Sequence, residues 1–108
     1  MKTLIHEKTT YHIGQSAEEN WTLIARAAKD HWWVHLEGRA SAHIILEIDD
    51  PLDDELVFAA DLCKIQTKIE RPRLQCVATR VGNLRLGSKA GEVYFKKDGT
   101  GHVRHFVA

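Results

Sequence analysis

The chain has 108 residues, of which 44% are hydrophobic and 28% charged, and its formal net charge is zero. That length fits one domain with one core, and that composition argues against wholesale disorder. The apolar stretches are far shorter than a membrane span, and the first residues lack the apolar region of a signal peptide. We therefore expect a cytoplasmic protein, one compact domain over residues 1–108, that does not associate with a membrane.

The charges are unevenly distributed along the chain. Residues 1–63 hold five Lys and Arg against twelve Asp and Glu, a balance of −7, whereas residues 64–108 hold ten against three, a balance of +7. A neutral protein with one basic side can orient a polyanion on that side. The alternative is that the two halves interleave on folding and the asymmetry disappears.

The first part of the chain predicts a hairpin followed by a helix. Residues 2–6 and 9–13 are rich in β-branched and aromatic types and can pair across Glu7-Lys8. Ser16 and Glu19 have the spacing of a capping box, which predicts a short helix that ends near residue 28.

The middle of the chain predicts two strands and a second helix. Residues 31–36 and 43–48 have the composition of strands, and the apolar run Ile44-Ile45-Leu46 is typical of a strand covered on both faces. Asp49-Asp50-Pro51 favours a helix start, with Asp as the N-cap and Pro in the first helical position. The apolar spacing extends this helix to about Thr67.

The last part predicts three strands. They are expected at 74–80, at 92–96 after an irregular loop over 82–91, and at 102–107 after a hairpin turn at 98–101. The element order indicates an α+β fold with a mainly antiparallel sheet and two helices.

The two cysteines are predicted to be reduced. Cys63 lies on the second predicted helix and Cys76 on a predicted strand. A secreted domain of this size often carries more bridges, and a buried free cysteine usually packs as a small apolar residue.

Motifs for catalysis or cofactor binding are missing from the sequence. It contains no Walker loop, no GxGxxG after a strand, and none of the CxxC or HExxH spacings that are common in zinc sites. We expect no cofactor and no metal. His35 and His43 flank one turn and can become cross-strand neighbours, either as a structural pair or as part of a catalytic or metal site.

A basic surface is the stronger functional candidate. One outward member of the adjacent Trp32 and Trp33 could stack on a base beside such a surface, unless helices cover both indoles. The basic side chains that we expect to contact nucleic acid are Arg73, Arg80, Arg85, Lys89, Lys96 and Arg104.

Four pieces of the chain resemble one domain family. Asp30-His31-Trp32-Trp33-Val34-His35 followed by Ser41-Ala42-His43 resembles the D-x-x-W-x-H and S-A-H core of the NFACT-R domain. Gly14 and Asn20 match its upstream glycine and asparagine, and the segments 83–85 and 89–93 look like its basic turn and its K-P-G-x-V strand entry. The matched residues are Gly14, Asn20, Asp30, Trp33, His35, His43, Arg85, Lys89 and Gly91.

The resemblance implies a non-catalytic nucleic-acid-binding module. NFACT-R domains occur in ribosome-associated quality-control factors, where they help to contact tRNA, and in a eukaryotic DNA-binding family whose S-A-H variant this chain resembles. It implies tRNA or ribosomal RNA as the first ligand, the ribosome as a further partner, and DNA as the second ligand. Where the family has lysine, asparagine and glutamine, this chain has Gln15, Ser16 and Glu19, which argues against phosphate contacts there.

Two other classes of function stay open at this point. An enzyme would use Asp30, His35 and His43 as an acid–base or metal site. An interaction adaptor would bind a basic protein through the acidic half of the chain. Oligomeric state and the preference between RNA and DNA have no signature in the sequence.

Overall fold

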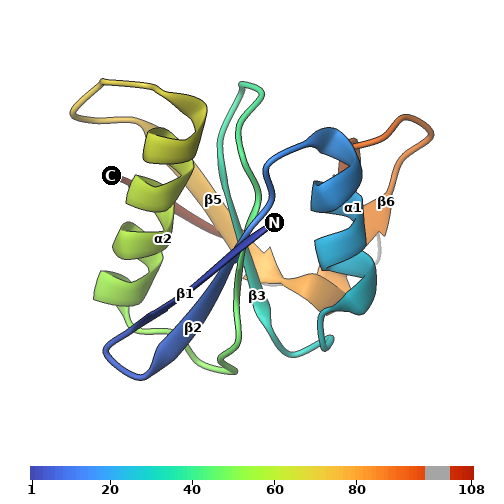
Figure 1. The fold of residues 1–108 in the computed structure, drawn as a ribbon, viewed down its shortest axis with the longest axis horizontal. Coiled ribbons are helices and arrows are strands. Elements are labelled where there is room, and N and C mark those ends of the chain that lie inside the picture. Colours follow the sequence, from blue (N-terminus) through green and yellow to red (C-terminus); the bar gives the residue numbers. More distant parts are fainter. Residues whose placement is uncertain (97–102) are drawn as a thin grey trace.

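The computed structural model describes residues 1–96 and 103–108, and in them one antiparallel sheet carries a helix on each face (Figure 1). The sheet has six strands in the order β1-β2-β4-β3-β5-β8. They are β1 (Lys2–His6), β2 (Thr9–Ile13), β3 (Trp32–Leu36), β4 (Ile44–Leu46), β5 (Gln75–Arg80) and β8 (Arg104–Val107). The helices are α1 (Ala17–Arg26) and α2 (Asp53–Thr67). The predicted α+β class, with a mainly antiparallel sheet and two helices, is confirmed.

The hairpin of β1 and β2 forms as predicted. Its two central residues, Glu7 and Lys8, have φ angles of 48° and 70°. A two-residue hairpin turn with positive φ at both positions follows the right-handed twist of the strands, which explains why non-glycine residues accept this backbone here.

Both faces of the central strands are covered. Side chains alternate along a strand, so Trp32 and Val34 of β3 pack toward α2 whereas Trp33 packs toward α1. Trp32 and Trp33 are only 2% and 4% exposed, so of the two alternatives for these residues the one with both indoles covered holds, and neither can stack on a base. The expectation for Ile44-Ile45-Leu46 is confirmed, because all three residues are buried and they alternate between the two cores.

Helix α2 begins later than predicted. Its N-cap is Leu52, and the Glu55 carboxylate accepts a hydrogen bond from the Leu52 N–H at 2.8 Å. Pro51 therefore precedes the cap and is not the first helical residue, and Leu52 takes the N-cap position that was predicted for Asp. The helix ends at Thr67 as predicted, with Lys68 left-handed at φ 60°. Within the described ranges, neither helix is long and apolar enough to cross a membrane.

The segment after β5 differs most from the prediction. A 3₁₀ turn (Val81–Asn83) leads into β6 (Leu84–Leu86), which pairs with β7 (Val93–Phe95) as a separate two-stranded sheet. The loop expected over 82–91 thus contains a strand, because Leu84 packs into the α1-side core. The last two strands do not pair with each other, since β8 pairs with β5. The predicted turn at 98–101 lies outside the described residues.

Candidate functional site

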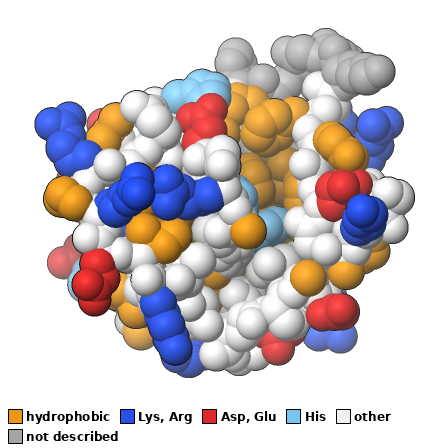
Figure 2. All heavy atoms as spheres, turned by 90° about the horizontal axis from the view of Figure 1, so that it is seen from above, with side chains coloured by type: hydrophobic (Ala, Val, Ile, Leu, Met, Phe, Trp, Pro, Cys, Tyr) orange, Lys and Arg blue, Asp and Glu red, His pale blue; other side chains and the backbone are white. Residues whose placement is uncertain are grey.

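A pocket of about 520 Å³ opens at the end of the sheet that carries the β3–β4 turn. Figure 2 looks onto this end and shows a hollow in the middle of the face, with a histidine side chain inside it. The start of α1, the β3–β4 turn, the end of α2 and the β6–β7 loop form the walls. The lining residues are Gly14, Gln15, Ser16, Ala17, Asn20, His35, Ala40, Ser41, Ala42, His43, Gln66, Thr67, Ala90 and Gly91.

Five residues matched to NFACT-R line this pocket although they are far apart in the sequence. They are Gly14, Asn20, His35, His43 and Gly91. Trp33 lies beside them without lining the pocket, because its indole is buried and its Nε1 donates a hydrogen bond to His43 Nδ1 at 3.1 Å.

The two histidines form the predicted cross-strand pair. The rings of His35 and His43 are 4.8 Å apart, edge to face. Because His43 Nδ1 accepts from Trp33, the proton of the neutral ring is on Nε2. Burial, with a smaller contribution from His35, lowers the pKa of His43 to about 3, and burial also lowers the pKa of His35. Both rings are therefore neutral at pH 7.

A close contact between Gly14, Asn20 and His43 joins β2, α1 and the β3–β4 connection. The Gly14 N–H donates to the His43 carbonyl at 3.0 Å, and the His43 N–H donates to Asn20 Oδ1 at 3.3 Å. A Cβ atom on Gly14 would lie 1.8 Å from Asn20 Oδ1, which is a hard clash. Glycine at this position is thus what lets the three segments meet.

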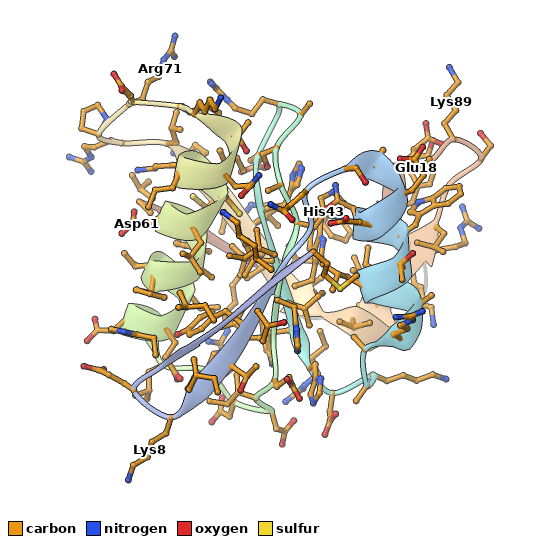
Figure 3. All side chains as sticks on the ribbon, in the orientation of Figure 1. Lys8, Glu18, His43, Asp61, Arg71 and Lys89 are labelled. Atoms are coloured by element: carbon orange, nitrogen blue, oxygen red, sulfur yellow. The ribbon has the colours of Figure 1, made fainter. Side chains whose placement is uncertain are left out.

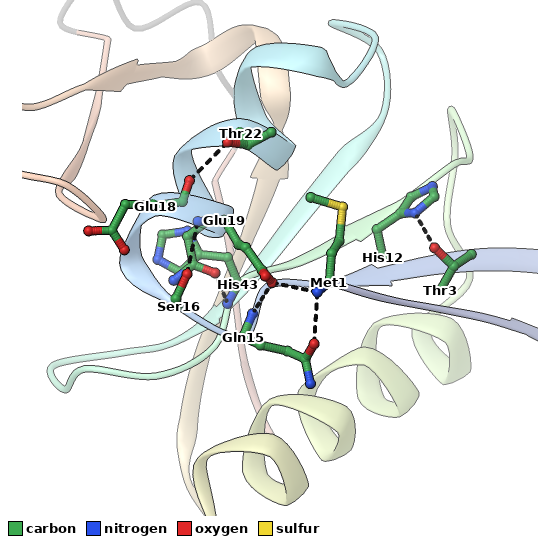
Figure 4. A network of polar contacts seen from close by, with 10 residues as sticks. Met1, Thr3, His12, Gln15, Ser16, Glu18, Glu19, Thr22 and His43 are labelled. Atoms are coloured by element: carbon green, nitrogen blue, oxygen red, sulfur yellow. Dashed lines mark hydrogen bonds and ion pairs between the residues drawn. The ribbon is translucent and has the colours of Figure 1, made fainter.

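The start of α1 is fixed by a polar network (Figure 4). Ser16 Oγ accepts from the Glu19 N–H at 3.2 Å, which confirms Ser16 as the N-cap. The Glu19 carboxylate accepts from the Gln15 N–H at 2.9 Å and pairs with the Met1 amino group at 2.8 Å. These contacts, the Met1 amino group first, lower the pKa of Glu19. The predicted capping box is therefore only half formed, because Glu19 reaches Gln15 and Met1 and not the Ser16 N–H.

The β6–β7 loop is anchored on α1. Gly91 has φ 84°, and a Cβ atom there would approach the Ala17 Cβ to 3.1 Å. The Trp21 indole donates to the Glu92 carbonyl at 2.9 Å. This packing holds Lys89, which directly precedes the lining residue Ala90, beside the pocket.

Two of the six predicted basic contacts are paired with acidic residues from the first half of the chain. Arg80 lies 3.0 Å from the Asp49 carboxylate, and Arg104 lies 3.6 Å from that of Asp50. Both guanidinium groups also lie over the Trp32 ring, at 5.5 and 4.6 Å from its centroid. The halves of the chain interleave here, so part of the charge asymmetry cancels on folding.

The other four predicted cations do not form one strip with these two. Arg85 lies on β6 with its guanidinium 5.9 Å from the Tyr94 ring centroid, Lys96 follows β7, and Lys89 is in the loop between the two strands. Arg73 lies on the segment between α2 and β5. Figure 3 shows its neighbour Arg71 and Lys89 on loops at opposite sides of His43.

The pocket mouth has two basic residues that were not among the predicted contacts, Arg39 and Lys68, beside the predicted Lys89. Arg39, Lys68 and Lys89 are exposed, and each is adjacent in sequence to a lining residue. Among the described residues none of the three has an ion-pair partner. Glu18 also lies at this end, so the surface is mixed (Figure 3). Arg39 lies two positions before the Ser41-Ala42-His43 motif, and this closeness in the sequence could have indicated that Arg39 lies beside the pocket.

The acid–base site that requires Asp30 does not assemble. Asp30 precedes β3, whereas His35 lies near its other end, so the two residues are roughly 15 Å apart along an extended strand. Within residues 1–96 and 103–108, no three His, Cys, Asp or Glu side chains gather closely enough to hold a metal ion.

Comparison with solved structures identifies a neighbour for the fold. No family model matches the chain, and no curated protein matches it. The C-terminal part of the fibronectin/fibrinogen-binding protein from Streptococcus suis has a similar structure, with a TM-score of 0.80 and 22% sequence identity. The match covers 95% of this chain but only 43% of that one, so this chain spans less than half the length of its neighbour. At this identity the similarity shows the fold alone, and the resemblance to NFACT-R stays a prediction.

Proposed function

We propose that this protein is a non-catalytic nucleic-acid-binding module whose first ligand is an unpaired segment of RNA, such as those in tRNA or ribosomal RNA, with DNA second. The observation that carries the proposal is the pattern of charge at the pocket. Its lining contains no Asp, Glu, Lys or Arg, while Arg39, Lys68 and Lys89 are exposed around its mouth. Unpaired nucleic acid has the complementary pattern, with uncharged bases that can be splayed out and charged phosphates beside them.

The charge along α2 favours approach from the same end. The helix begins with Asp53, Asp54 and Glu55, and the exposed Lys68 lies directly after its other end, beside the pocket. A polyanion is therefore repelled at one end of α2 and attracted at the other. The resemblance to NFACT-R supports the same ligand, since five of its matched residues line the pocket.

A fluorescence anisotropy titration with labelled tRNA, single-stranded RNA and single-stranded DNA at several salt concentrations tests the proposal. Each phosphate neutralised on a single strand contributes a slope of about 0.7 in log affinity against log salt, so three cations predict a slope of about 2. Arg39→Gln, Lys68→Asn and Lys89→Gln should each lower that slope by about 0.7.

The chain offers a matched control for Lys68→Asn. Lys8 is also an exposed lysine with a left-handed backbone, φ 70° against 60°, but it lies at the opposite end of the molecule (Figure 3). Lys8→Asn should leave affinity and slope unchanged. Absence of binding to all three nucleic acids, or an equal effect of Lys8→Asn and Lys68→Asn, would overturn the proposal.

Protein binding is a second candidate, favoured by an exposed apolar edge. The name of the structural neighbour describes fibronectin and fibrinogen binding. In this chain β1 lies at the edge of the sheet, and its Leu4 and Ile5 are 39% and 69% exposed. Surface plasmon resonance on immobilised fibronectin and fibrinogen tests this candidate. Binding that persists after nuclease treatment and is lost in Ile5→Ser would favour it over nucleic-acid binding.

A further inference from the structure

Two side chains that line the pocket each keep a donor that has no hydrogen-bond partner in the described part of the chain. His43 Nε2 carries the ring proton because Nδ1 accepts from Trp33, and Asn20 Nδ2 is left over because Oδ1 accepts from the His43 N–H. His43 and Asn20 are 4% and 8% exposed, and both line the pocket. Both donor nitrogens are reached from the pocket, so a ligand that supplies acceptors there can bind them.

Several other polar atoms of the pocket are already used. Ser16 Oγ accepts from the Glu19 N–H, and Thr67 Oγ1 accepts from the Ala42 N–H at 3.0 Å. Ser41 Oγ accepts from the Leu36 N–H and donates to the Ala42 carbonyl, both at 3.2 Å. The half-exposed Gln66 amide also lines the pocket and makes none of these bonds. The donors of His43 and Asn20 are the unused capacity of the two polar side chains of the lining that are buried.

The walls suit a flat and uncharged occupant. The alanine and glycine residues of the lining present small apolar surfaces. The His35 ring is stacked on Trp33, with the ring planes 6° apart, and His35 itself lines the pocket, so an aromatic occupant can contact a ring that is already held in place. A volume of about 520 Å³ is far larger than a phosphate ion needs and lies within the usual range for small-molecule pockets.

We infer that the pocket binds a single unpaired nucleobase that presents two adjacent acceptors, with guanine as the preferred base, held by the His43 Nε2–H and Asn20 Nδ2–H donors. Guanine offers O6 and N7 side by side, whereas adenine pairs its N7 acceptor with an N6 donor. Asn reads adenine by using its oxygen and nitrogen together. Asn20 cannot do so, because its oxygen is bound to the His43 N–H. This inference rests on the proposed function and specifies what that surface recognises.

Nitrogen-15 NMR titrations of the 108-residue protein with GMP, AMP and inorganic phosphate test it. The Trp33 indole N–H reports on His43, and its signal is assigned by its loss in Trp33→Phe, or by elimination with Trp21→Phe and Trp32→Phe. GMP should shift this signal and the Asn20 amide signals, with AMP binding about tenfold more weakly and phosphate leaving both unmoved. Equal shifts with phosphate would make the pocket an anion site, and equal affinity for AMP would exclude readout by the donor pair. Either result, or no shift with GMP at millimolar concentration, overturns the inference.

Two variants check the pocket independently. Asn20→Asp keeps the oxygen that holds the His43 N–H but removes both Nδ2 donors, and it should abolish the preference for GMP over AMP. Ala90→Leu fills the exposed mouth without touching a buried contact, and should weaken GMP binding even if Asn20→Asp fails to fold. If Arg39→Gln, Lys68→Asn and Lys89→Gln weaken RNA binding but leave GMP binding unchanged, the basic surface and the base pocket contribute separately. RNA binding that is unaffected by Ala90→Leu would leave the proposed function standing and refute the base pocket.

Discussion

The Trp33 indole donates a hydrogen bond to His43 Nδ1 over 3.1 Å, and both residues are almost fully buried. This contact fixes the tautomer of His43 and connects the α1-side core to the pocket. Because a protonated imidazole has no acceptor, the contact can exist only while His43 is neutral.

The first prediction concerns pH. The pKa of His43 is about 3 in the folded protein and near 6.5 in the unfolded chain, so below pH 6.5 the unfolded state binds the extra proton. The stability contributed by neutral His43 is complete above pH 6.5 and is lost as pH falls toward 3. Urea unfolding should therefore show a loss of about 2 kcal/mol from this group between pH 7 and pH 5.

The control for this experiment is His43→Asn, which keeps an acceptor near the Nδ1 position and cannot titrate. The stability of His43→Asn should fall less steeply over the same pH range. Carboxylates titrate in both proteins, so the difference between the two curves is the contribution of His43. Parallel pH curves for the two proteins would contradict the prediction.

The second prediction concerns Gly14. A Cβ at this position would lie 1.8 Å from Asn20 Oδ1, so Gly14→Ala should destabilise the protein by about 2 kcal/mol or more and displace Asn20. Gly38→Ala is the comparison, because Gly38 has φ 74° but no atom within 4 Å of the added Cβ. It should cost about 1 kcal/mol from backbone strain alone. Thermal unfolding of both variants measures the difference, and the reverse order would contradict a steric role for Gly14.

The third prediction concerns the cysteines. Both Cys63 and Cys76 are free and buried, and burial raises the pKa of each thiol. The thiolate is the reactive form, so neither should react with a disulfide reagent such as DTNB at pH 8 while the protein is folded. Both should react in urea. Rapid modification of either thiol in the native protein would show that this part of the core opens readily.

The fourth prediction concerns the two arginines paired with Asp49 and Asp50. Arg80→Gln and Arg104→Gln should leave RNA affinity within about twofold, because their charges are already paired. Exposed ion pairs stabilise little, so each variant should change stability by less than about 1 kcal/mol. The anisotropy titration checks the first point, and a tenfold loss of RNA affinity would move the interface to this part of the sheet.

Local signals in the sequence predicted local structure well. The β1–β2 hairpin, the Ser16 N-cap and the pairing of His35 with His43 each depend on residues a few positions apart or on a single turn. The reduced state of both cysteines was also predicted correctly. The hairpin, the N-cap and the histidine pair each depend on residues that are close in the sequence. The free cysteines need only be buried.

The misses have a common physical origin in contacts between distant segments. Strand β6 has three residues, too few for an alternating pattern, and its Leu84 is stabilised by the core beneath it. The charge of Arg80 is paired with Asp49, 31 positions earlier, which a count along the chain cannot anticipate. Gly14, His43 and Gly91 meet at the pocket for the same reason, and only the resemblance to NFACT-R grouped them.

The four-segment construction of the pocket has a thermodynamic consequence. Its walls come from positions 14–20, 35–43, 66–67 and 90–91, so the cavity is complete only when both helices and the small β6–β7 sheet are docked. A ligand that occupies it binds the folded state and not the unfolded one. At a ligand concentration one hundred times the Kd, occupancy therefore adds about 2.7 kcal/mol to the free energy of unfolding. The melting temperature of the whole chain rises accordingly. A thermal shift screen of nucleotides thus measures pocket occupancy without any label.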